Sequence, residues 1–357
     1  MSAAKKVLNL ALQGGGAHGA FTWGALDRLL EEEEIEIEGV SATSAGAMNA
    51  AALKRGWTED GRAGARAALA DFWLGLAGLE NVFSEAIMDW LRAVSPSPSV
   101  TARVLEFAPQ TLATEAITRV FSPYQFNPMN YHPLRSVVEN LTADGAMHSA
   151  VGPKLFISAT NVRDGKPRIF MGGEITTDAI LASACLPTLY QAIEIDDPRT
   201  GRREAYWDGG YIGNPALYPL HYHTRATDLL IVHINPLYRE ELPRSAQEIA
   251  SRINEISFNA SLLQELRVIV FVNRLLDEGL LPPDRMKRNN VHSVSDDALM
   301  NQLGIVTKMT PSKALILQLR DAGYAAMAHF LTRHGAQIGE CSSVDVRGIL
   351  DSPGALV

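Results

Sequence analysis

The chain has 357 residues, of which 46% are hydrophobic and 20% charged, a composition typical of a globular protein with a large core. Its formal net charge of −8 argues against broad electrostatic binding to nucleic acid or to anionic bilayers. The two cysteines, Cys185 and Cys341, are far apart and show no CxxC or Cys/His spacing, which predicts neither a disulfide framework nor a zinc site. This cysteine usage favours a reducing, cytoplasmic setting.

The amino-terminal segment carries a basic pair followed by the apolar run VLNLAL. Asn9 interrupts this run and glycines end it, so it predicts a strand rather than a signal peptide. No uninterrupted apolar stretch of the chain approaches the roughly 18 residues that a membrane-spanning helix needs. We therefore expect neither a signal peptide nor a transmembrane helix, and any membrane contact would be peripheral.

The first part of the chain alternates between strand and helix patterns. VLNLAL is followed by a glycine turn and by a helix over residues 18–34, which has an apolar face. IEIEGVSA, residues 35–42, has the pattern of a second strand, and the small-residue stretch after it predicts a helix that ends at Gly56. A βαβα order predicts a parallel sheet covered by helices.

The next stretch, from about residue 58 to 150, is helical and irregular. Its apolar pieces are DFWLGLAGL, EAIMDWLRAV and TEAITRVF, and it contains the loop SPSPS. We predict a helical cap here. Apolar stripes on helices are more often ordinary core than a ligand or membrane surface, so these pieces alone do not define an acyl-chain site.

Strand and helix patterns alternate again after the cap. The predicted strands are KLFISATNV, PRIFMG, YQAIEID, AYWDGG and DLLIVHINP, with a helix at TTDAILASACLP. Beyond Pro236 the pattern predicts one or two helices over residues 247–278, a basic loop RMKRNN, and a helix over residues 312–333. We thus predict a domain over residues 5–240 with the cap inserted, and a helical extension over residues 241–357 packed on the core.

A glycine-rich turn, GGGAHG at residues 14–19, lies between the first strand and the first helix. Consecutive glycines let backbone N–H groups point at an anion near a helix N-terminus, so the turn suits an oxyanion or a phosphate. The turn also matches the dinucleotide fingerprint GxGxxG, with Glu36 and Glu38 further along. This motif alone does not distinguish the oxyanion-binding turn of a hydrolase from the dinucleotide-binding turn of a dehydrogenase.

Two further motifs carry candidate chemistry. ATSAG, residues 42–46, is a variant of GxSxG at a turn from strand to helix, where small neighbours make room for an exposed serine oxygen. Taken alone, Ser44 also fits a helix N-cap. WDGG, residues 207–210, follows a short strand, and an Asp-Gly-Gly sequence is by itself most often just a turn.

In this order, the three motifs resemble the patatin-like phospholipase family, with its glycine-rich oxyanion loop, nucleophile elbow and Asp-Gly-Gly turn. The resemblance runs from about Val7 to Asn235 and includes ATNV at 159–162 and ASACLP at 182–187. It implies a three-layer α/β fold with a central, mostly parallel sheet flanked by helices, plus a helical cap and a C-terminal helical extension.

The resemblance also implies a role for each motif. Ser44 would be the nucleophile and Asp208 the base that removes its proton directly. The oxyanion hole would be Gly14, Gly15 and Gly16, with His18, Gly46, Gly209 and Gly210 in supporting positions. The implied activity is lipid acyl hydrolysis of the phospholipase A, lysophospholipase or esterase type, on a lipid or acyl-ester substrate and without a cofactor.

The chain departs from the family pattern at two places. His18 stands where family members usually carry Arg or Lys, which would make any charge beside the oxyanion loop depend on pH near neutrality. Ala42 replaces the first glycine of the elbow but keeps a small side chain. These departures are the features that favour an inactive relative retained for binding.

Two other functions stay open at the level of sequence. A Ser-His-Asp α/β-hydrolase would use Ser44, Asp208 and one of His221, His223 and His233, but too few strands precede the serine for that fold. A Rossmann-type nucleotide-binding protein would explain the glycine turn and leave TSAG and WDGG unexplained. No metal site is predicted, because Asp196, Asp197 and the scattered histidines show no ligand spacing.

Overall fold

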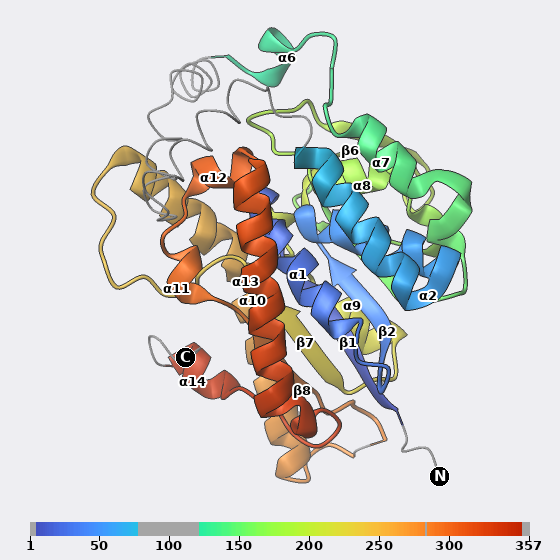
Figure 1. The fold of residues 1–357 in the computed structure, drawn as a ribbon, viewed down its shortest axis with the longest axis vertical. Helices are drawn as coiled ribbons and strands as arrows, with labels where there is room; N and C mark the ends of the chain where they lie inside the picture. The colour runs from blue at the N-terminus through green and yellow to red at the C-terminus, as the bar shows by residue number, and fades with distance from the viewer. Residues whose placement is uncertain (1–4, 78–120, 283, 352–357) are drawn as a thin grey trace.

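The structure is a computed structural model that describes residues 5–77, 121–282 and 284–351. Its centre is one eight-stranded sheet with the strand order β5-β6-β3-β2-β1-β7-β8 and with β4 paired on β3 (Figure 1). The strands are β1 (Lys6–Leu12), β2 (Ile35–Ala42), β3 (Lys154–Asn161), β4 (Pro167–Met171), β5 (Ile193–Asp197), β6 (Arg202–Asp208), β7 (Asp228–Val232) and β8 (Asn290–Val294).

Parallel pairing joins the five strands from β3 to β8, whereas β4 and β6 run antiparallel to β3 and β5 runs antiparallel to β6. The α-helices are α1 (Gly19–Leu29), α2 (Ala45–Ala77), α6 (Pro123–Phe126), α7 (Arg135–Thr142), α8 (Thr177–Ser183), α9 (Tyr218–His223), α10 (Ala246–Asp277), α11 (Asp297–Met300), α12 (Ile305–Met309), α13 (Lys313–His334) and α14 (Val346–Asp351). Short 3₁₀ turns are η1 (Gly16–His18), η2 (Ala143–His148), η3 (Gly172–Glu174), η4 (Gly209–Tyr211) and η5 (Gly335–Gln337).

Helices cover both faces of the sheet, because its central strands are apolar on both sides. Successive side chains of a strand point to opposite faces. In β1, Leu10 and Leu12 belong to the core that α1, α2, α8 and α13 cover, whereas Ala11 belongs to the core that α9, α10 and α14 cover. In β7, Leu230 and Ile231 divide in the same way. The predicted three-layer α/β fold with a mostly parallel sheet is therefore confirmed.

The second helix extends further than the sequence predicted. Instead of ending at Gly56, α2 continues to Ala77, with non-helical backbone at Asp60 and Gly61. Residues 71–77 of the DFWLGLAGL piece lie in its last turns, and Phe72 and Trp73 are buried in the main core. EAIMDWLRAV and nearly all of TEAITRVF lie outside the described residues.

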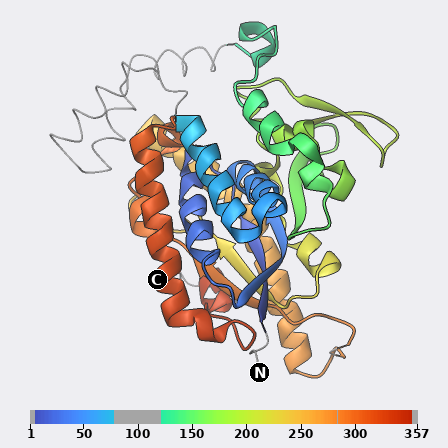
Figure 2. The ribbon, with the colours of Figure 1, turned by 45° about the vertical axis from the view of Figure 1, so that its right-hand side comes forward.

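The carboxyl-terminal third contributes a strand as well as helices. Helices and a basic loop were predicted there, without a strand, but β8 pairs in parallel with β7 and extends the sheet. Helix α13 lies alongside α1 (Figures 1 and 2). The two helices approach closely at Gly24 and Gly323, where an added Cβ would collide with the main chain of the other helix. Among the described residues, no helix combines the length and hydropathy needed to cross a membrane.

Candidate active site

The edge of β3 brings the ATSAG elbow and the WDGG turn together. Ala42, the last residue of β2, pairs with Ile157 of β3, and Asp208, the last residue of β6, pairs with Ala159. Strand β4 pairs with the opposite edge of β3 over these residues. Strands β2 and β6 therefore share one edge of β3, and β6 begins to pair where β2 stops. The two chain segments therefore meet end to end, with Ser44 just beyond one and Asp208 at the tip of the other.

Ser44 has the backbone geometry of a nucleophile elbow. Its φ of 54° lies in the left-handed region, which non-glycine residues rarely adopt, and it stands between β2 and α2. The Ser44 N–H donates to Ser183 Oγ at 2.9 Å, and the Thr43 hydroxyl donates to the Gly213 carbonyl at 2.6 Å. Two hydrogen bonds to acceptors on distant segments thus hold the strained turn.

Asp208 is fully buried and has one oxygen without a partner. Its Oδ1 accepts the Gly210 N–H at 2.7 Å, whereas Oδ2 is buried and accepts no hydrogen bond in the described structure. Burial raises the pKa of Asp208 to about 7, against the opposing effects of the Gly210 N–H and the Ser44 hydroxyl. A carboxylate with a pKa near neutrality suits general-base catalysis.

The glycine loop lies beside the serine at Gly14 and carries two unpaired donors in its next residues. The Gly14 N–H donates to Asn214 Oδ1 at 2.6 Å, but the N–H groups of Gly15 and Gly16 donate to no described residue. Gly14 also makes room for the elbow, since a Cβ there would lie 2.5 Å from Ser44 Cβ. Gly16 has a φ of +59°, which favours glycine.

The other small residues of the motifs let chain segments approach. Added Cβ atoms at Gly46 and Gly209 would collide with main-chain carbonyls of β1 and β3, and one at Gly210 would lie 2.8 Å from the Phe258 ring. Ala42 is fully buried, so the alanine in place of the family's glycine fits the core. Close packing at these positions explains why the motifs contain small residues.

A family model described as patatin-like phospholipase matches residues 10–221. The chain belongs to the patatin-like phospholipase family. The match covers the glycine loop, the elbow and the Asp-Gly-Gly turn, and it supports lipid acyl hydrolysis as the general activity. No curated protein matches the chain significantly.

Two solved structures resemble this patatin-like chain. VipD from Legionella pneumophila shares 14% sequence identity at a TM-score of 0.42, with 93% of this chain and 67% of VipD covered. The heterodimeric ExoU–SpcU complex of the Pseudomonas aeruginosa type III secretion system shares 16% at a TM-score of 0.32, with 92% of this chain and 52% of the matched chain covered. The patatin-like chain thus spans about half of that second chain.

The environment of His18 contradicts the expectation that its charge changes near neutral pH. The side chain is buried, and Nε2 lies 2.8 Å from Thr307 Oγ1. Burial, Lys308 and Arg239 hold the pKa of His18 well below its usual value. That expectation is wrong: His18 is a neutral hydrogen-bonding residue at pH 7, because burial and two nearby cations disfavour its charged form.

The histidines of the alternative triad have other neighbours. His221 Nδ1 lies 3.1 Å from Asn289 Oδ1, and His223 stacks on Phe156. His233 is buried, its Nδ1 has no partner in the described structure, and burial lowers its pKa to about 4. No histidine is among the groups that shift the pKa of Asp208.

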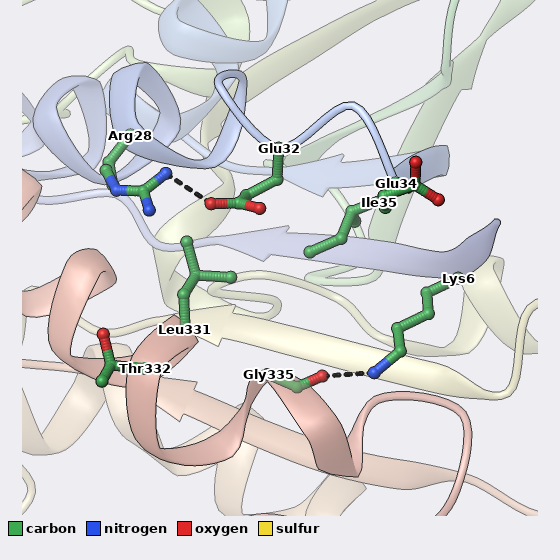
Figure 3. A pocket seen from close by; sticks show the side chains of 8 residues that line it. All are labelled: Lys6, Arg28, Glu32, Glu34, Ile35, Leu331, Thr332 and Gly335. Carbon is green, nitrogen blue, oxygen red and sulfur yellow. Dashed lines mark hydrogen bonds and ion pairs between the residues drawn. The ribbon is translucent and has the colours of Figure 1, made fainter. Parts of the chain in front are cut away.

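The described residues offer no metal ligands at this site, and the hollow of Figure 3 lies elsewhere. No group of three or more His, Cys, Asp or Glu side chains suited to a metal ion occurs among the described residues. A hollow lined by Lys6, Arg28, Glu32, Glu34, Ile35, Leu331, Thr332 and Gly335 is shown in Figure 3. Lys6 and Ile35 begin β1 and β2, so this hollow lies at the end of the parallel strands opposite to Ser44.

Sequence reasoning missed the polar residues that hold the site. Ser183, Asn214, Asn235 and Gln13 connect the elbow and the glycine loop by hydrogen bonds. Of these residues, only Ser183 lies in a stretch that carries the family resemblance, ASACLP. No spacing pattern in the sequence distinguishes the other three. These side chains lie on separate segments and become neighbours only in the folded chain.

Proposed function

We propose that this patatin-like chain is a serine lipid acyl hydrolase of the phospholipase A, lysophospholipase or esterase type, with Ser44 as the nucleophile and Asp208 as its base. The observation that carries the proposal is the strained Ser44, with a φ of 54°, next to a buried Asp208 whose Oδ2 lacks a partner. Such an oxygen is available to take the serine proton without a histidine.

The first step forms an acyl-enzyme. Ser44 Oγ attacks the ester carbonyl carbon while its proton passes to Asp208, and the carbonyl oxygen becomes an oxyanion. The N–H groups of Gly15 and Gly16, which donate to no described residue, stabilise that charge. When the tetrahedral intermediate collapses, the ester bond breaks and the leaving alcohol takes the proton from Asp208.

The second step releases the acyl group by the same path. A water molecule gives a proton to Asp208 and attacks the acyl carbon, and the same amides hold the second oxyanion. The bond to Ser44 Oγ then breaks, and Oγ recovers its proton from Asp208. The net reaction converts an ester and water into a carboxylic acid and an alcohol.

Labelling with a fluorophosphonate probe tests the dyad. We expect wild type to be modified at Ser44, and Ser44→Ala and Asp208→Asn to lose labelling and to lower kcat for a soluble ester by at least about 10³-fold. Ser41→Ala and Asp228→Asn are matched controls, because both residues are buried and hydrogen-bonded elsewhere. Full esterase activity in either dyad variant contradicts the proposal.

The organisation around the dyad also stays a prediction. We propose a catalytic domain over residues 5–240 with a cap at about 58–150, an extension over residues 241–357, and a lipid or acyl-ester substrate reached by peripheral membrane contact. The burial of Leu315, Ile316 and Leu319 of α13 in the main core supports an extension that packs on the catalytic domain.

A further inference from the structure

A short helix from outside the family match supports the glycine loop. Helix α12 contacts η1, and an added Cβ at Gly16 would collide with the Lys308 carbonyl. The neighbouring Thr307 bonds to the His18 ring. The loop that carries the free N–H donors therefore rests on residues 307 and 308, far beyond the matched residues 10–221.

The Lys308 ammonium is partly buried and connects to this loop through one side chain. Its Nζ donates to Asn235 Oδ1 at 2.7 Å and to Asn254 Oδ1 at 3.1 Å. Asn235 Nδ2 in turn donates to the Gly14 carbonyl at 2.8 Å. The Gly14 carbonyl and the Gly15 N–H belong to one peptide group, and hydrogen bonds in a chain polarise one another.

The same ammonium also lies near the Asp-Gly-Gly turn. Lys308 Nζ is 5.9 Å from the centre of the Phe258 ring, and Phe258 packs against Gly210. Asp208 accepts the Gly210 N–H. Phe258 therefore lies between Lys308 and the turn that carries Asp208, and α10 supplies both Asn254 and Phe258.

The charged groups around Lys308 are bound elsewhere or neutral. Glu255 on α10 is bound by Arg239 at 2.6 Å and by Arg252 at 3.2 Å. His18 on η1 is neutral, since its pKa lies well below its usual value. No carboxylate is bound to Lys308 in the described structure, so its positive charge acts on the loop.

We propose that Lys308 is a positioning residue for the acyl transfer, and that its ammonium acts through Asn235 on the Gly14–Gly15 peptide to strengthen the oxyanion donor. It supplies from α12 the cation that His18 does not supply. This inference rests on the proposed function. It assigns a role in the reaction to the carboxyl-terminal third of the chain.

The charge of Lys308 gives the inference a signature in the pH profile. Burial lowers the pKa of Lys308 to about 8, with Glu255 raising it and Arg239 lowering it further. Burial raises the pKa of Asp208 to about 7. Activity should thus rise as Asp208 loses its proton and fall again as Lys308 loses its own, which gives a bell-shaped kcat/KM.

The test compares Lys308→Met, Lys308→Arg and wild type by kcat and KM for a soluble ester from pH 5 to pH 10. We expect Lys308→Met to lower kcat about tenfold or more, which is a smaller effect than removing an oxyanion donor. The kcat/KM of Lys308→Met should also lack the fall at alkaline pH. Lys308→Arg should keep most of the activity at pH 7.5 and shift the alkaline fall upward, because a guanidinium stays protonated.

Lys287→Met is the matched control. Its ammonium is half-buried and donates to the Leu220 and Thr224 carbonyls, away from the glycine loop, so we expect the wild-type pH profile. If Lys308→Met does not fold, the Lys308→Arg profile decides. An alkaline fall that stays at the wild-type pH in Lys308→Arg overturns the inference.

Fluorophosphonate labelling separates this inference from the proposed function. Wild type labelled at Ser44, with Lys308 variants that keep its pH profile, overturns the role of Lys308 alone. A folded wild type that is neither labelled nor active on esters overturns both. Labelling of Ser44 that slows in Lys308→Met and recovers in Lys308→Arg supports both.

Discussion

At the scale of single residues, the site depends on groups held in unfavourable states. Ser44 has a φ of 54°, and Asp208 is a buried carboxylate with an unpaired oxygen. Each state costs stability, and each suits a reactive group. Two hydrogen bonds maintain these states in the folded chain: the Ser44 N–H donates to Ser183, and the Gly210 N–H donates to Asp208.

Asp208 should make the protein less stable as pH rises. Its folded pKa of about 7 exceeds the ordinary 3.8, so the folded state binds the extra proton between these values. The folded state therefore loses stability as pH rises through this window, by an amount on the order of a few kcal/mol. Asp208→Asn carries no such charge, and we expect its Tm to exceed that of wild type increasingly from pH 4 to pH 8.

Thermal unfolding of both proteins across this range measures the effect. Asp228→Asn is the control, because hydrogen bonds lower the pKa of Asp228 despite its burial and its contribution should have the opposite sign. A Tm difference between wild type and Asp208→Asn that does not change with pH would rule out the raised pKa.

At the scale of elements, helix α1 links the glycine loop to the carboxyl-terminal helices. It begins directly after η1, and α13 packs along its whole length. The contact depends on Gly24 and Gly323, which let the two main chains touch. The position of the loop is thus coupled to a helix about three hundred residues later in the sequence.

Gly323→Ala should separate these two helices. The new Cβ would collide with the Phe21 carbonyl, so we expect a loss of about 1–3 kcal/mol in the free energy of unfolding, measured with urea. Gly75→Ala is the control within a helix, since nothing lies within 4 Å of that position and alanine favours a helix by about 1 kcal/mol. Equal stability of Gly323→Ala and wild type would contradict this account of the contact.

At the scale of the whole molecule, the sheet and both cores extend beyond the family match. Strand β8 adds an edge to the sheet, and α10 and α13 cover its two faces. Arg239, which lies beyond the matched residues 10–221, binds Glu255 of α10 at 2.6 Å. The candidate active site thus belongs to a larger folded unit than the family motifs define.

A chain that ends at residue 240 should therefore fail to form the site. It would lose β8, the apolar face of α13 and Lys308, which leaves β7 as an exposed edge. We expect this truncated chain to aggregate or to show no fluorophosphonate labelling at Ser44, whereas the full-length control measured beside it is labelled. A soluble, labelled truncated chain would instead show that residues 5–240 fold alone.

The sequence by itself determined the fold class and the three motifs, because both depend on local signals. Alternating strand and helix patterns specify a parallel sheet, and glycines beside Ser44 and Asp208 mark turns that need small residues. The extent of α2 and the strand β8 were not predictable, since packing against distant segments decides them.

Only the tertiary structure decided the electrostatics of the site. The neutral state of His18, the raised pKa of Asp208 and the position of Lys308 depend on burial and on neighbours far along the chain. Asn214 and Asn235 have no sequence signature, because one amide side chain resembles another until its partners are known. Pattern records which residues are near in sequence, whereas desolvation and charge act on those that are near in space.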